Sequence, residues 1–121
     1  MKFHSKKNAK KIIASEECVI WEYPLGTDST NGAVAEINGR YPKTGYAKNN
    51  VSQELVYVIA GMGTLEFVDR EVELEQGDVA LIEPGEAFAW QGKKLEVFIP
   101  CFPAWKPEQH EIIEAEEKNA S

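Results

Sequence analysis

Short apolar segments recur along the chain, and turn-forming residues separate them at close intervals. Apolar residues that alternate with polar ones over about five to eight positions are typical of β-strands. The intervening segments are rich in glycine, proline, asparagine and aspartate, which favour turns. The pattern predicts strands at residues 18–23, 33–37, 53–60, 64–68, 71–74, 79–82, 87–91 and 95–99. Because helical segments do not alternate with these strands, the sequence predicts an all-β fold, an antiparallel sandwich or barrel.

The two ends of the chain lack this strand pattern. Lysines gather near the start, at positions 2, 6, 7, 10 and 11, and the end is acidic with few apolar residues after Ile113. Such composition is typical of solvated or disordered segments. We therefore divide the chain into a basic N-terminal arm (1–14), a barrel domain (15–107) and an acidic C-terminal tail (108–121), which we expect to be disordered.

Length and charge narrow the classes of function. A chain of 121 residues is long enough for one domain with its own core. Its net charge of −7 argues against a nucleic-acid surface, which needs concentrated basic side chains. No apolar run approaches the roughly 18 residues of a membrane span, and no apolar segment follows the early lysines as in a signal peptide. The sequence therefore predicts a cytoplasmic protein that binds neither nucleic acid nor membrane.

The cysteines and histidines form no recognisable catalytic or zinc pattern. Cys18 and Cys101 lie far apart, without the Cys-x-x-Cys spacing of a zinc site, and we expect both to be buried apolar residues. His4 lies in the basic arm, and His110 follows the last predicted strand, where we expect an exposed or capping residue. A catalytic thiol needs a base beside it, and this pattern predicts none.

One acidic residue stands in an otherwise apolar strand. Glu54 begins the segment Glu-Leu-Val-Tyr-Val-Ile-Ala-Gly that ends at Gly61. An unpaired carboxylate in such an apolar strand costs free energy. Residues 77–85 read Gly-Asp-Val-Ala-Leu-Ile-Glu-Pro-Gly. The two segments resemble the end of the first and the start of the second sequence motif of cupins, and the resemblance extends over about Ala33 to Pro107. It implies a double-stranded β-helix, a single-domain jelly-roll barrel whose mouth opens onto a ligand pocket, commonly assembled as a homodimer.

The chain departs from the cupin motifs at the metal-binding positions. Cupins have His-x-His three or four residues before the glutamate. Here these positions hold Lys48 and Asn50 or, with the longer spacer, Ala47 and Asn49. Phe88 stands where the second motif has its histidine. Because imidazole gives such sites their affinity for Mn, Fe, Ni or Zn, we expect this chain to hold neither the usual metal nor another cofactor.

Three interpretations of Glu54 remain open without a metal. In the first, Glu54 is one polar anchor of a pocket for a small polar ligand, a sugar or an organic acid. The predicted ligand-binding residues are Arg40, Lys48, Asn50, Glu54, Phe88 and Trp90. In the second, burial raises the pKa of Glu54, which is then the catalytic acid or base of a metal-free sugar isomerase or epimerase, with Lys48 or Tyr46 as partner. In the third, the carboxylate is a relic paired with Lys48 or Asn50, and the chain is a structural or partner-binding module.

Two of the candidate residues have a plainer interpretation. Arg40, which follows the predicted Asn38-Gly39 turn, either clamps a ligand anion in a bidentate fork or forms an exposed ion pair with Glu36. Trp90 either stacks against a ligand ring or fills the barrel interior. The sequence leaves both choices open.

Strand periodicity assigns side chains to the two faces of each strand. If Glu54 points into the barrel, Val56 and Val58 point the same way, and Phe88 and Trp90 share a face by the same rule. The residues that then point outward from this strand are Leu55, Tyr57 and Ile59. Because exposed apolar strands tend to be covered, this outward face predicts a homodimer.

Overall fold

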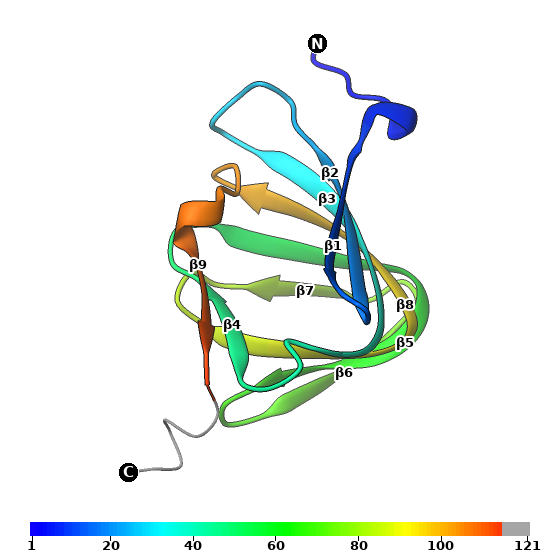
Figure 1. Cartoon of the computed structure of the whole chain (residues 1–121), viewed down its shortest axis with the longest axis vertical. Helices are drawn as coiled ribbons and strands as arrows, with labels where there is room; N and C mark the ends of the chain where they lie inside the picture. Colours follow the sequence, from blue (N-terminus) through cyan, green and yellow to red (C-terminus); the bar gives the residue numbers. More distant parts are fainter. Residues whose placement is uncertain (115–121) are drawn as a thin grey trace.

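Long, bent strands build the molecule (Figure 1). The structure is a computed structural model that describes residues 1–114. The strands of these residues are β1 (Lys10–Ser15), β2 (Cys18–Tyr23), β3 (Asn31–Tyr41), β4 (Tyr46–Asn49), β5 (Gln53–Phe67), β6 (Glu71–Glu75), β7 (Val79–Ile82), β8 (Ala87–Phe102) and β9 (His110–Ile113). Two short 3-10 helices are η1 (Lys6–Asn8) and η2 (Pro107–Gln109). Within the described chain, no helix has the length and apolar character needed to cross a membrane.

All the strand pairs are antiparallel, and β5 and β8 join the two parts of the sheet. Neighbouring strands follow the order β1-β2-β3-β8-β4-β9, and β5 pairs with β6, β7 and β8. In Figure 1 the strands curl around a common interior. The predicted all-β jelly-roll barrel is therefore confirmed.

Three predicted turns lie inside continuous strands. β3 runs through Asn38-Gly39, β5 through residues 61–63 and β8 through residues 92–94. The pairing shifts register near these points, so the extra residues form β-bulges, which bend a strand without ending it. Gly61 shows why glycine is needed there: its φ is +77°, and an added Cβ would lie 1.9 Å from the carbonyl oxygen of Lys94.

The sheet extends beyond the expected barrel at both ends. β1 begins at Lys10, inside the segment interpreted as an arm, and pairs with β2. β9, inside the segment interpreted as a tail, pairs with β4 and places His110 opposite Asn49. The disorder expected for residues 108–121 is wrong for residues 108–113, which belong to η2 and β9, and residues 115–121 lie outside the described residues.

The core occupies the interior that β5 and β8 share. Val56 and Val58 of β5 and Val97 of β8 are fully buried. Tyr57 lies between the two buried valines and is 45% exposed, so the alternation predicted for this strand is confirmed. Glu54 therefore stands on the interior face of β5.

Candidate functional site

A cavity of about 380 Å³ lies inside the barrel. Its walls are mainly apolar, and side chains of β1, β2, β3, β4, β8 and β9 contribute to them. Representative apolar residues of the wall are Ile12, Ile20, Ala35, Ile37 and Ile99. The volume lies within the range of small-molecule sites, and such sites combine apolar walls with a few convergent polar groups.

Glu54 is an acidic residue of the cavity wall whose pKa is raised. It lies on β5 between β7 and β8, opposite Cys101. The Cys101 thiol donates a weak hydrogen bond to Glu54 Oε2 across 3.8 Å, and the Asn49 side chain donates another. Burial raises the pKa of Glu54 from 4.5 to about 7, against the opposite effect of these two donors. Near neutral pH, Glu54 is therefore able both to give and to take a proton.

Neither cysteine of the cavity wall is activated as a nucleophile. Burial raises the pKa of the Cys101 thiol, and the neighbouring Glu54 carboxylate raises it further. Burial alone raises the pKa of Cys18 to about 11. Because the thiolate is the reactive form, both side chains remain thiols at neutral pH. The expectation that both are buried is confirmed.

Asn49 is the centre of a polar network on the cavity wall. Its side chain is almost fully buried, and its Oδ1 lies 2.9 Å from Trp105 Nε1 and 2.9 Å from His110 Nδ1. Burial lowers the pKa of His110, which favours the neutral ring. We call Asn49, Glu54, Cys101, Trp105 and His110 the inner cluster; each of them lines the cavity.

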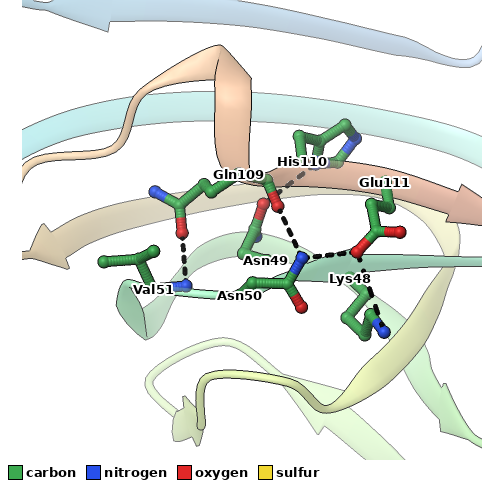
Figure 2. Close-up of polar contacts among 7 residues, drawn as sticks. All are labelled: Lys48, Asn49, Asn50, Val51, Gln109, His110 and Glu111. Atoms are coloured by element: carbon green, nitrogen blue, oxygen red, sulfur yellow. Dashed lines mark hydrogen bonds and ion pairs between the residues drawn. The ribbon is translucent and has the colours of Figure 1, made fainter.

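Lys48 and Asn50 lie on the opposite face of the same strand region. Figure 2 shows their side chains beside Glu111 of β9. Lys48 Nζ lies 3.8 Å from Glu111 Oε2, and Asn50 Nδ2 donates to the same oxygen. The hydrogen bond from Asn50 and the charge of Lys48 lower the pKa of Glu111. We call Lys48, Asn50 and Glu111 the outer cluster.

The predicted site residues therefore separate into two groups. Glu54, Phe88 and Trp90 line the cavity, and the two aromatic rings meet edge to face with centroids 6.3 Å apart. Lys48 and Asn50 do not line it, because strand alternation turns them to the outer face.

Arg40 does not line the cavity either. Its guanidinium donates to the carbonyl oxygens of Pro42 and Gly45, at 2.7 and 3.0 Å, and lies 3.5 Å from Glu66 Oε1. These bonds hold the connection between β3 and β4. The ion pair expected with Glu36 is replaced by the one with Glu66.

Sequence reasoning missed Asn49, His110, Trp105 and Cys101 as cavity residues. Asn49 follows from the longer of the two cupin spacers, which predicts Ala47 and Asn49 at the inward positions; both line the cavity. His110 was expected to be exposed or a cap. It is the C-cap of η2, and the pairing of β9 with β4 also puts it in the cavity wall. No local signal marks this pairing, because β9 and β4 are far apart in the sequence.

Known proteins share this barrel. The profile of the AraC-like ligand binding domain matches residues 31–90. Pac13 from Streptomyces, described as a nucleoside dehydratase, has a TM-score of 0.83 at 13% identity, over 94% of this chain and 92% of Pac13. This chain belongs to the cupin superfamily. Two further cupins with similar structures are KdgF from Halomonas sp. (TM-score 0.71, 11% identity, 89% of this chain and 97% of KdgF) and ectoine synthase from P. lautus (0.72, 13%, 93% and 90%). No curated protein sequence matches this cupin.

The residues of this cupin do not fit the metal that its superfamily commonly holds. The four positions that correspond to metal ligands are Ala47, Asn49, Glu54 and Phe88, and only an amide and a carboxylate among them offer donor atoms. Across residues 1–114, no group of three or more His, Cys, Asp or Glu side chains is placed to hold a metal ion. One carboxylate and one amide are a poor set for a transition metal.

Proposed function

We propose that this cupin binds a small organic molecule in its cavity, without a metal, and that Glu54 is the main polar anchor. The observation that carries the proposal is the position of Glu54, an ionisable side chain on the inner wall of a largely apolar cavity. Asn49 and His110 add polar groups on the same wall, and Phe88 and Trp90 add aromatic surface. A ring with apolar faces and polar edges, such as a sugar or a cyclic organic acid, matches such walls.

The structural relatives give the proposal its first probe. Variants of Pac13 have been solved with uridine, a molecule that joins a sugar to a planar base. We therefore choose uridine, ribose and malate as probes for calorimetric titration of this cupin. Saturable binding of at least one probe is the expected result. Failure of all three, together with failure of a wider sugar and acid panel in thermal-shift assays, would contradict the proposal.

Two variants locate the binding. Glu54→Gln removes the ionisable anchor, and we expect it to weaken the bound probe about tenfold, the cost of one good hydrogen bond. Glu111→Gln makes the same chemical change in the outer cluster, and its affinity should equal that of the unaltered protein. Equal loss in both variants would place the bound probe outside the cavity.

A second candidate function is catalysis of proton transfer. The observation that favours it is the pKa of Glu54, raised by burial to about 7, the value at which a general acid or base is most useful at neutral pH. The names of the related structures include a dehydratase, a cyclase and a synthase. If this cupin is an enzyme, Glu54→Gln abolishes turnover of the bound probe, followed by NMR, and leaves binding within about tenfold. If a probe binds but no probe is consumed, catalysis is contradicted and ligand binding remains the proposed function.

Metal independence is tested separately from ligand binding. Plasma mass spectrometry on protein purified without chelator, before and after soaking with Mn, Fe, Ni and Zn, should find well under one metal per chain. A stoichiometric metal that survives dialysis would contradict this expectation.

The predicted homodimer has a candidate surface. Tyr57, Val79, Leu81 and Phe98 are 45%, 62%, 45% and 41% exposed. Tyr57 pairs in register with Val79 on one side and Phe98 on the other, so the four residues form one outward strip across β7, β5 and β8. A second copy of the chain would cover this apolar strip. Sedimentation should show a dimer that Val79→Glu dissociates, and a monomer at micromolar concentration would contradict it.

A further inference from the structure

We propose that His110 is a second ligand-contacting residue of the cavity, and that Asn49 holds it in the tautomer whose free Nε2 accepts a hydrogen bond. The inference rests on the proposed ligand-binding function and names the ligand more closely. The ligand of the cavity carries a hydroxyl or N–H donor that reaches His110, and a second polar atom that reaches Glu54.

The first step concerns the orientation of the Asn49 amide. The indole Nε1 of Trp105 has a hydrogen and no lone pair, so it can only donate. Its partner 2.9 Å away on Asn49 is therefore the amide oxygen. The amide nitrogen then points the other way, where it donates to Glu54. One donor-only side chain thus fixes both ends of the amide.

The second step concerns the His110 ring. His110 Nδ1 lies 2.9 Å from the same Asn49 oxygen, which has no hydrogen to give. Nδ1 must therefore carry the proton. Because burial lowers the pKa of His110, the ring is neutral near pH 7, and the remaining nitrogen, Nε2, keeps its lone pair. No hydrogen bond to Nε2 occurs within the described part of the chain.

The third step concerns what keeps the ring in place. Gln109, the residue before His110, is 8% exposed, and its Oε1 accepts from the backbone nitrogens of Val51 and Ser52, each at 2.8 Å. Figure 2 shows the bond to Val51 and, beside it, Asn49 reaching the His110 ring. Trp105 packs against that ring with centroids 5.8 Å apart. Buried bonds on one side and an aromatic contact on the other hold the ring before any ligand arrives, which reduces the entropy cost of binding.

The fourth step concerns the chemistry that the wall offers. A neutral Nε2 accepts and cannot donate, while protonated Glu54 donates and ionised Glu54 accepts. The pair therefore favours a ligand with a donor at one point and a group of either kind at the other. Hydroxyl and N–H groups of a sugar or nucleoside meet this requirement, whereas a fully ionised dicarboxylate offers no donor to His110.

The tautomer is testable without a ligand. Long-range ¹H–¹⁵N correlation spectra of the full chain at pH 7.5 should show His110 with a protonated Nδ1 and an unprotonated Nε2. His4, in the N-terminal segment, provides an internal reference on the same spectrum. In Asn49→Ala, His110 should no longer prefer the Nδ1-protonated tautomer, and its signals should be an average of the two tautomers. A dominant Nε2–H form in the unaltered protein would overturn the inference.

Uridine then tests contact with Nε2. We expect uridine to shift the His110 Nε2 resonance, and His110→Phe to weaken uridine binding about tenfold, while the control His4→Phe binds as the unaltered protein does. Uridine that shifts the Trp90 indole signal without moving His110 Nε2 would overturn the inference and leave the proposed function intact. Uridine that moves no cavity signal at all would count against the inference, and the proposed function would then be decided by the other probes and the wider panel.

Discussion

The two faces of the β4–β9 pair adjoin similar polar residues in opposite surroundings, and Glu54, beside the inner face, belongs to β5. On the inner face, burial raises the pKa of Glu54 beside Asn49. On the outer face, Asn50 and Lys48 lower the pKa of Glu111. Each face thus places an asparagine next to a glutamate. Access of water decides whether the pKa of the carboxyl group rises or falls. Exclusion from water disfavours the charged form, whereas polar or cationic neighbours at the surface favour it.

Adjacent residues illustrate how sharply the two faces differ. Asn49 is 4% exposed and Asn50 is an exposed residue, although one peptide bond joins them. A shift of one position in a strand moves a side chain from one face to the other. The inner asparagine organises the cavity, and the outer one contacts a surface carboxylate. We expect three substitution experiments to test this contrast.

The largest expected effect is on the pH dependence of stability. The pKa of Glu54 is raised from 4.5 to about 7, so between these values the folded protein holds a proton that the unfolded chain has lost. The free energy of unfolding therefore falls by up to about 3 kcal/mol as pH rises through this window. Above the window it is level. Urea titrations from pH 4.5 to 8 should show this fall in the unaltered protein relative to Glu54→Gln.

The matched control for that experiment is Glu111→Gln. The pKa of Glu111 is lowered, so its contribution to stability is present above its unfolded pKa and is lost as pH falls through the folded one. Relative to Glu111→Gln, the unaltered protein should therefore not lose stability as pH rises. The same decline against both variants would mean that Glu54 is not its source.

The next effect in size concerns the two asparagines. Asn49→Ala removes the acceptor of Trp105 Nε1 and His110 Nδ1, and we expect a loss of about 2 kcal/mol, because donors kept from water are left unpaired. Asn50→Ala should change the free energy of unfolding by less than about 0.5 kcal/mol, as exposed substitutions usually do. Urea midpoints measure both, and equal losses would contradict the assigned faces.

The smallest effect is expected for Lys48→Ala. Its ion pair with Glu111 is partly exposed, and such pairs contribute little to stability. The unfolding midpoint should stay unchanged within error, while the pKa of Glu111, followed by carbon NMR, should rise toward its ordinary value. A clear loss of stability would show that the outer cluster supports the fold.

The sequence predicted the barrel and part of the site for reasons that the structure makes plain. Alternate residues of a strand point to the same face, so the position of each residue along β5 placed Glu54, Val56 and Val58 together. Both valines are fully buried. The same rule placed Phe88 and Trp90 together in the cavity. These predictions needed only neighbours along one strand.

Other predictions failed where the answer depended on more than one strand. The choice between the two spacers before Glu54 decided whether Asn49 or Asn50 faces inward, and nothing within β4 itself distinguishes them. His110 faces the cavity only because β9 pairs with β4. The predicted turns at residues 61–63 and 92–94 are bulges, because glycines serve turns and bent strands alike.

One feature of the barrel bears on how the protein is made. His110 comes to Asn49 from 61 positions further along the chain. Synthesis proceeds from the N-terminus, so β1 to β8 leave the ribosome before η2 and β9 do. The nascent protein can close most of its sheet while one side of the cavity is still missing. The proposed ligand site is therefore completed only with β9, after most of the scaffold has already been synthesised.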